Sequence, residues 1–266
     1  VSFTYPGADR PALAGLDLEV PAGSTLGVVG PVGSGKSTLL QLLGRLHDPE
    51  GEVCLDGTPL RSLDPGELRD HLGYVSQEAF LFSDTWAANV GFGADAPLPE
   101  ERLEELAAAV GLDEELAGFE DGLQQRVGER GVTLSGGQRQ RTCIARALAR
   151  DPRVLVLDDA LSAVDTGTES RLVELFQGEG AGRTVVVASH RLSAIRHAEQ
   201  ILVLTPEGEP EALERRMSAG VDGAVSFLRP DGVVDRAHAG LLYIESHRHL
   251  PLLAWPRRLI DTVVEV

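Results

Sequence analysis

The sequence predicts an α/β fold in which a buried parallel sheet is interrupted by a long helical segment. Residues from about 78 to 150 show apolar residues at helical spacing. Before and after this region the chain contains short apolar runs that are typical of parallel strands covered on both faces. These runs are STLGVV (24–29), RVLVLD (153–158), TVVVAS (184–189) and QILVL (200–204). A strand, a helical insertion and a return to strands together predict an α/β sheet with an inserted helical subdomain.

The part before residue 78 is expected to form strands around one helix. Residues 1–5 and 16–20 alternate between apolar and polar side chains, as half-buried strands do. KSTLLQLLGRL (36–46) has helical spacing and is followed by an Asp-Pro-Glu-Gly stretch that stops a helix. Two more short strands are expected at EVCLDG (52–57), which closes on an Asp-Gly turn, and at GYVSQ (73–77).

Several helices are expected in the inserted region, and one more follows it near 168–177. The helical segments of the insertion are PEERLEELAAAVGL (99–112), DEELAGF (113–119) and GGQRQRTCIARALAR (136–150). After residue 204 the pattern weakens, and turn and charge signals mix with short apolar runs. The sequence begins at Val1 inside a strand-like stretch, so we expect it to be part of a longer chain.

Composition excludes some classes of function. The chain has 266 residues, with 24 basic against 41 acidic side chains and a formal net charge of −17. This charge repels phosphate backbones, so direct binding to nucleic acid is disfavoured. We find no uninterrupted apolar run of about 18 residues, the length that a membrane-spanning helix needs. The two cysteines lack metal-ligand spacing, which indicates reduced packing residues in a cytosolic protein.

GPVGSGKST (30–38) fits the phosphate-binding pattern G-x-x-x-x-G-K-[ST] and lies between an expected strand and an expected helix. Its glycines let backbone N–H groups point at phosphate oxygens, and the helix adds its positive N-terminal end. Lys36 is expected to reach the β- and γ-phosphates, and Ser37 to offer a hydroxyl to Mg²⁺. A chance glycine-rich turn is disfavoured by the flanking strand and helix. The nucleotide-binding candidates here are Gly30, Gly33, Ser34, Gly35, Lys36, Ser37 and Thr38.

Two acids end the apolar run LVLDD (155–159). Open α/β sheets place ligand chemistry at the carboxyl ends of their strands. A phosphate-binding loop needs a second group for Mg²⁺, and Asp158 is the candidate. Taken alone, an aspartate at a strand end is more often a cap or turn former. Whether Asp159 is long enough to act as a base is a separate question.

LSGGQ (134–138) has two interpretations. Ser135 and Gln138 have the spacing of a capping box, which would make the segment an ordinary helix start. Two glycines in a first helical turn are costly, however, at about 1 kcal/mol each relative to alanine. Their presence suggests close backbone approach to a ligand. Because the chain's own loop already surrounds its phosphates, that ligand is expected to be a phosphate held by another subunit.

With these motifs in order, the chain resembles the nucleotide-binding domain of an ATP-binding cassette (ABC) transporter of the exporter type. The matching motifs are VSFTYP, the phosphate-binding loop, YVSQ, VGERG (127–131), LSGGQ, LVLDD, SAVD (162–165) and ASHRLS (188–193). FLFSDTWAANV (80–90) and VGERG are similar to exporters in particular. The resemblance implies a P-loop NTPase core with an N-terminal antiparallel β subdomain and an inserted α-helical subdomain at about 78–150.

The resemblance also implies roles for individual residues. Tyr5 would stack on adenine, and Gln77 would touch Mg²⁺ and the attacking water. His190 would hydrogen-bond the γ-phosphate. The implied catalytic residues are Asp159, His190 and Gln77, the implied metal ligands are Ser37, Gln77 and Asp158, and the implied cofactors are ATP and Mg²⁺.

The partners that the resemblance implies are a second nucleotide-binding domain and the membrane domains of an exporter, without nucleic acid. Ser135, Gly136, Gly137 and Gln138 would close over ATP held by the opposing domain in a head-to-tail dimer. Asp165 would lie at that interface. The implied location is the cytoplasmic face of the cell membrane, within a transporter. The resemblance does not indicate which substrate is transported, or whether the partner domain is identical to this one or different.

The sequence departs from the family pattern at Asp159, where the family usually has glutamate. The missing methylene withdraws the carboxylate, and a misplacement of about 1 Å can cost about a hundredfold in rate. We therefore favour a degenerate site in one half of a heterodimeric exporter, in which an intact LSGGQ completes the partner's site. The alternative is that Asp159 serves as the base, somewhat slowly.

The second departure is the tail. We expect residues 1–204 to form the nucleotide-binding domain and 205–266 a divergent C-terminal segment. DGVVDRAHAGLL (231–242) faintly resembles the segment that closes the family's domain, displaced along the chain. Two alternatives to export remain from the sequence. One is a soluble cassette ATPase of DNA repair or translation, against which the acidity argues. The other is a P-loop small-molecule kinase, which has no use for LSGGQ.

Overall fold

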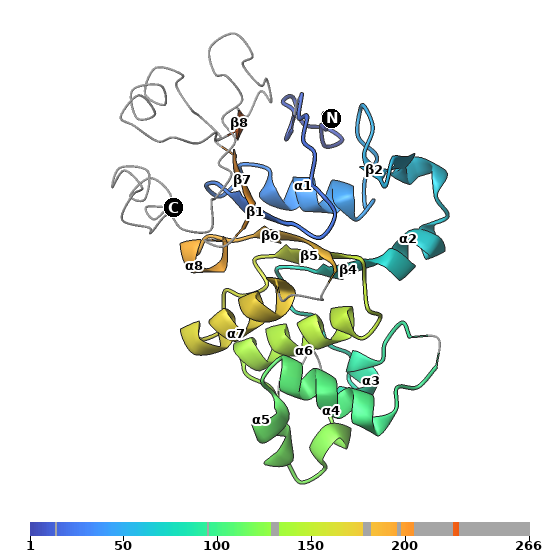
Figure 1. The fold of residues 1–266 in the computed structure, drawn as a ribbon, viewed down its shortest axis with the longest axis vertical. Coiled ribbons are helices and arrows are strands. Elements are labelled where there is room, and N and C mark those ends of the chain that lie inside the picture. Colours follow the sequence, from blue (N-terminus) through green and yellow to red (C-terminus); the bar gives the residue numbers. More distant parts are fainter. Residues whose placement is uncertain are drawn as a thin grey trace.

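A six-stranded sheet in the order β4-β5-β6-β1-β7-β8 forms the centre of the computed structural model (Figure 1). The structure describes residues 1–13, 15–94, 96–128, 133–177, 182–195, 198–204 and the backbone of 226–228. The strands are β1 (Thr25–Val29), β4 (Leu72–Val75), β5 (Val154–Asp158), β6 (Thr184–Ala188), β7 (Gln200–Leu204) and β8 (Ser226–Leu228). All five pairings between neighbours in this sheet are parallel, which confirms the predicted parallel sheet.

Helices cover both faces of the sheet. On one face lies α1 (Lys36–Leu43), and on the other lie α6 (Gly136–Leu148), α7 (Thr166–Gln177) and α8 (Leu192–Ile195) (Figure 1). Strand β5 illustrates why both faces need cover: its successive side chains point to opposite faces of the sheet. Leu155 and Leu157 belong to the apolar cluster that contains α6, whereas Val156 packs in the cluster of α1. All three of these side chains are fully buried, as the continuous apolar run predicted.

The helical insertion lies between β4 and β5, which nevertheless pair directly, with Leu72 opposite Val154. It contains α3 (Trp86–Val90), α4 (Glu100–Ala109), α5 (Asp113–Ala117), the short 3₁₀ helix Gly122–Gln124 and α6. The fully buried Trp86 ring joins α3 to α6, and its Nε1 donates to Thr142 Oγ1 at 3.1 Å. The predicted helices at 99–112, 113–119 and 136–150 are therefore confirmed, with ends shifted by a few residues.

The N-terminal part contains a small antiparallel pair, β2 (Cys54–Leu55) with β3 (Thr58–Pro59). The expected strands at 1–5 and 16–20 are wrong as regular strands. Ser2 and Phe3 form only isolated antiparallel bridges, to Glu50 and Leu13. Gly7 and Gly15 turn the backbone at positive φ, and Pro11 offers no N–H, so a longer ladder is interrupted. A 3₁₀ turn at Leu60–Ser62 and α2 (Pro65–His71) lead to β4.

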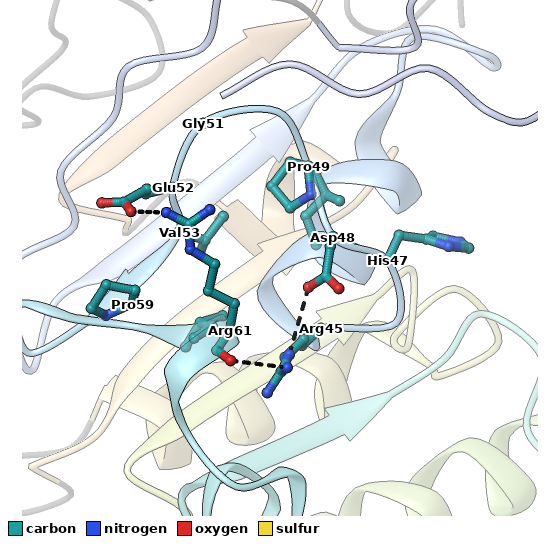
Figure 2. A pocket seen from close by; sticks show the side chains of 11 residues that line it. Arg45, His47, Asp48, Pro49, Gly51, Glu52, Val53, Pro59 and Arg61 are labelled. Atoms are coloured by element: carbon teal, nitrogen blue, oxygen red, sulfur yellow. Dashed lines mark hydrogen bonds and ion pairs between the residues drawn. The ribbon is translucent and has the colours of Figure 1, made fainter.

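The C-terminal end of α1 borders a cavity of about 140 Å³ (Figure 2). The helix ends at Leu43, earlier than expected, and Arg45 takes a left-handed conformation with φ of 48°. The Arg45 guanidinium donates to the carbonyl oxygen of Leu63 at 2.8 Å and to that of Arg61 at 3.2 Å. Arg61 forms an ion pair with Glu52 (Figure 2). Because both cations have protein partners, we interpret this cavity as the joint between α1 and the β2–β3 pair.

One strand of the C-terminal segment was not predicted. Strand β8 pairs in parallel with β7, where the sequence pattern gave no strand signal. The remaining residues of 205–266, including the 231–242 stretch, lie outside the described residues, as do 129–131 of VGERG. Among the helices that the structure describes, none is long and apolar enough to cross a membrane.

Candidate functional site

A glycine-rich loop connects β1 to α1 at the carboxyl end of the sheet. Gly30 has φ of 155° and Gly35 has φ of 92°, conformations that side chains with a Cβ rarely adopt. Space is equally restrictive, because a Cβ on Gly30 would lie 2.1 Å from the carbonyl oxygen of Leu204. Gly35 is the N-cap of α1 and supplies no side-chain cap, so the first N–H groups of the helix remain available to a ligand.

Lys36 is the cation of this loop. Its side chain is buried, and Nζ donates to the carbonyl oxygens of Gly30 at 2.5 Å and Pro31 at 2.9 Å. Burial lowers the pKa of the Lys36 ammonium, while the carboxylates of Asp159 and Asp158 offset part of that shift. The loop therefore holds its ammonium group near both acids. An anionic ligand that reached this ammonium would also reduce its desolvation cost.

Ser37 joins the start of α1 to the end of β5. Its Oγ donates to Asp158 Oδ1 at 3.0 Å, and Asp158 is 6% exposed. Burial raises the pKa of the Asp158 carboxyl, and the hydrogen bond from Ser37 acts in the opposite direction. A hydroxyl and a buried carboxylate held this close are the oxygen ligands that Mg²⁺ prefers. Ser34 Oγ is also buried in the loop, without a hydrogen-bond partner among the described residues. These atoms fit a nucleotide phosphate with its metal ion.

Asp159 follows in an unusual backbone conformation, with φ of 47°. Its N–H donates to the carbonyl oxygen of Ala188 at 2.9 Å, which ties it to the end of β6. Its Oδ1 is buried without a hydrogen-bond partner in the described part of the chain. Aspartate tolerates the left-handed region better than most residues. The result is a buried carboxylate oxygen whose hydrogen-bonding capacity is unused among the described residues, on a residue whose backbone is tied to the end of β6.

His190 lies near the same acids, and Gln77 forms no described hydrogen bond with them. His190 comes just after β6, close enough that its electrostatic effect offsets a small part of the rise in the pKa of Asp158. Gln77 is exposed, two residues beyond the end of β4, and no hydrogen bond links it to the other candidates in the described residues. The structure thus brings together Lys36, Ser37, Asp158, Asp159 and His190, whereas no hydrogen bond among the described residues ties Gln77 to them.

Tyr5 lies beside α1. Its hydroxyl is within hydrogen-bond distance of Thr38 Oγ1, at 3.1 Å, and donates to Gln41 Oε1 at 3.0 Å. Its ring makes edge contacts with Phe3 and His47, at centroid distances of 4.9 and 5.5 Å. The side chain is 36% exposed, so part of it stays open to a ligand next to the glycine-rich loop.

The LSGGQ segment starts α6 with a complete capping box. Gln138 N donates to Ser135 Oγ at 3.2 Å, and Ser135 N donates to Gln138 Oε1 at 2.8 Å. A Cβ on Gly137 would lie 2.7 Å from the carbonyl oxygen of Ala163. Gly137 is therefore required by packing within the chain, an explanation that the sequence alone did not provide. Since α6 and α1 cover opposite faces of the sheet, we find no described hydrogen bond between LSGGQ and the glycine-rich loop.

Two residues that sequence reasoning did not single out hold the segment after Asp159. Gln140 is 5% exposed, its Nε2 donates to Ser162 Oγ at 3.0 Å, and its Oε1 accepts from Ala163 N at 2.8 Å. Arg191 donates to several oxygens of the same segment. The signals in the sequence were weak. Gln140 is a polar residue on the buried side of an expected helix, and Arg191 directly follows His190.

Comparison with known proteins agrees with this geometry. A sequence model of the family described as "ABC transporter" matches residues 13–162. The chain is 44% identical over 219 residues to an "ATP-dependent lipid A-core flippase" of Chromobacterium violaceum, covering 80% of this chain and 37% of that protein. A flippase of the same description from Vibrio cholerae is 41% identical over 232 residues, covering 86% of this chain and 39% of that protein.

A solved structure is similar as well. It is described as "Structure of a bacterial Atm1-family ABC exporter with ATP bound", with a TM-score of 0.74 and 38% sequence identity. The match covers 83% of this chain and 39% of that chain. The chain thus spans less than two-fifths of the length of each of these relatives.

Proposed function

This chain belongs to the ABC transporter family as an ATPase domain related to those of exporters, and from that premise we propose that it powers export through membrane domains outside this sequence. The observation that carries the proposal is the hydrogen bond from Ser37 to Asp158. It joins the glycine-rich loop to the strand end that bears both acids, which is where an α/β sheet places ligand chemistry. We propose the fold as a P-loop NTPase core with an N-terminal antiparallel β subdomain and an inserted helical subdomain, over residues 1–204.

For the nucleotide, we propose that the loop N–H groups and Lys36 bind the phosphates of ATP and that Tyr5 contacts adenine. The other phosphate-binding residues proposed are Gly30, Gly33, Ser34, Gly35, Ser37 and Thr38. Ser37 and Asp158 would hold Mg²⁺, with Gln77 reaching the site once its loop closes. The ion would neutralise phosphate charge when bound. The orphaned Ser34 Oγ and the buried Asp158 carboxylate support this proposal, because each lacks part of the polar environment that burial demands.

For hydrolysis, we propose that Asp159 accepts a proton from the attacking water and that His190 hydrogen-bonds the γ-phosphate. The buried, unpaired Oδ1 of Asp159 supports its role. A second candidate function rests on the same residue. With aspartate in place of glutamate, the site would turn over slowly and the chain would be the regulatory half of a heterodimeric exporter. In that case the chain would contribute chiefly its LSGGQ segment to the partner's ATP.

For assembly, we propose a head-to-tail dimer with a second nucleotide-binding domain at the cytoplasmic face of the cell membrane. Ser135, Gly136, Gly137 and Gln138 would meet ATP held by the opposing domain, with Asp165 at the interface. The exposed Ser135 at the start of α6 supports this arrangement, because α6 lies across the sheet from the chain's own phosphate loop.

The isolated chain is expected to be monomeric without nucleotide and to dimerise weakly with ATP. The physical reason is that the bound nucleotide would supply much of the interface between the two domains. Analytical ultracentrifugation with and without ATP measures this, in a variant slowed in hydrolysis such as Asp159→Asn. A tight dimer that forms without nucleotide and does not respond to ATP would contradict the sandwich arrangement.

Export is distinguished from a soluble cassette function by what stimulates turnover. ATP turnover should rise severalfold when the chain is joined to its membrane domains in lipid vesicles, because those domains favour the closed dimer. Added DNA or RNA should have no effect, given the net charge of −17. Stimulation by nucleic acid and indifference to the membrane domains would assign the chain to the soluble class.

A further inference from the structure

Arg191 binds the backbone of the segment that follows Asp159. Its Nη1 donates to the carbonyl oxygen of Val164 at 2.9 Å and lies 3.5 Å from that of Leu161. Its Nη2 donates to the carbonyl oxygen of Ser162 at 2.6 Å. One planar guanidinium thus contacts three carbonyl oxygens of a single turn. That geometry needs the fork of an arginine and is beyond the point charge of a lysine.

The same guanidinium is held by a buried acid. Arg191 Nη1 donates to Glu169 Oε2 at 2.8 Å, and Glu169 is only 2% exposed. Glu169 also accepts a hydrogen bond from the Ser193 hydroxyl. A buried carboxylate is stable only with such partners, so the position of the Arg191 head group is strongly restricted.

Arg191 is also the next residue after His190, and the backbone at this point is anchored. Arg191 N donates to Ser189 Oγ at 3.0 Å, and Ser189 N donates to the carbonyl oxygen of Val28 in β1 at 3.2 Å. Because one peptide unit joins the two residues, a displacement of His190 would also move the base of the Arg191 side chain. The guanidinium at the far end of that side chain hydrogen-bonds to carbonyl oxygens of segment 161–164.

From the other side, Gln140 of α6 holds the same segment through Ser162 and Ala163. The turn between Asp159 and Asp165 is consequently fixed by two elements. One is the helix that begins with LSGGQ, and the other is the loop that carries His190. Arg191 is the described side chain that joins the second element to the turn through hydrogen bonds.

We propose that Arg191 is a positioning residue, which transmits the contact between His190 and the γ-phosphate to segment 161–165 and so sets the surface that meets the partner domain. This inference rests on the proposed function. It predicts that ATP binding at the chain's own loop is independent of Arg191, whereas the nucleotide-driven association and turnover that follow depend on it.

Arg191→Lys tests this, because lysine keeps a positive charge for Glu169 and loses the fork that contacts the carbonyl oxygens. We expect the affinity for ATP by calorimetry to stay within about twofold, since none of the hydrogen bonds described for Arg191 reaches the glycine-rich loop. The turnover number should fall about tenfold with little change in KM, as expected for a small misplacement. ATP-dependent dimerisation should weaken in parallel. Arg102→Lys is the matched control, because Arg102 pairs with Glu105 on an exposed helix face.

A double-mutant cycle with His190→Ala distinguishes positioning from a purely structural role. If Arg191 acts through His190, the double variant should turn over no more than about twofold more slowly than His190→Ala alone. Multiplicative losses, or a lower melting temperature with unchanged dimerisation and turnover number, would overturn the proposal. A wild-type chain that binds ATP without dimerising would contradict the proposed dimer itself. Normal wild-type dimerisation together with a normal Arg191→Lys variant would contradict Arg191 alone.

Discussion

Lys36→Ala is expected to remove measurable ATP binding while the chain stays folded. Lys36 Nζ is the cation that the glycine-rich loop holds, and both Asp158 and Asp159 lie near it. Without the ammonium, the phosphates would face two carboxylates in a chain of net charge −17. Truncating one partner of a buried charge pair costs about 2–5 kcal/mol, or about thirtyfold to several thousandfold in affinity.

Isothermal calorimetry with Mg²⁺ and ATP measures this loss, and thermal unfolding checks that the variant is folded. Arg61→Ala is the matched control, because it also removes one positive charge, from an exposed pair with Glu52. Its ATP affinity should be unchanged. Near-native ATP affinity in Lys36→Ala would show that the phosphate-binding assignment is wrong.

The sequence offers a second measurement, since Lys36 is its only lysine. An amine-reactive reagent can therefore modify one lysine side chain of this sequence. Saturating ATP with Mg²⁺ should protect Lys36 from modification, as followed by mass spectrometry of its peptide. Equal labelling of Lys36 with and without ATP would contradict a phosphate contact at Nζ.

Sequence reasoning succeeded where local chemistry determines structure. The glycines around Lys36 can be recognised because few residues adopt the conformations of Gly30 and Gly35. The strand ending in Asp158 was equally clear, because a short continuous apolar run is typical of a parallel strand that is buried on both faces. The Ser135–Gln138 capping box was foreseen as well, since its partners are three residues apart.

Reasoning from sequence failed where partners are distant along the chain. The alternation at 1–5 suggested a strand, yet Phe3 pairs only through a single bridge to Leu13, because turns and prolines interrupt the ladder. Arg191 and Ser162 are 29 residues apart, and no local sequence pattern predicts that the Arg191 guanidinium donates to the carbonyl oxygen of Ser162. The need for glycine at 137 likewise depends on the distant Ala163.

Asp159→Glu is expected to raise the turnover number of the isolated chain about tenfold to a hundredfold. The reason is the distance between the side-chain carboxylate and the attacking water. Asp158 is fixed by Ser37, and Asp159 N is fixed by the carbonyl oxygen of Ala188. Leu155, Val156 and Leu157 of β5 are fully buried, so the backbone cannot slide to bring a short carboxylate closer to water at the γ-phosphate. One extra methylene supplies that distance.

The same substitution should lower the free energy of unfolding by about 1 kcal/mol, because the left-handed region is less favourable for glutamate than for aspartate. Asp151→Glu is a matched control, since Asp151 has the same φ of 47° at an exposed position. It should show a similar loss of stability in denaturant and no change in turnover. If the Asp159→Glu chain turns over faster although it is less stable, the gain comes from the longer side chain and not from better folding.

Asp159→Asn in the assembled transporter decides between a base and a regulatory site. Asparagine tolerates the left-handed conformation as aspartate does and keeps the side-chain shape, so folding should be preserved and only basicity lost. If the site is regulatory, overall ATP turnover should remain nearly unchanged, because the partner's site, completed by LSGGQ of this chain, would supply it. If Asp159→Asn abolishes turnover and Asp159→Glu gives no gain, then Asp159 is a competent base. In that case the short carboxylate already reaches its water, and the degenerate interpretation is wrong.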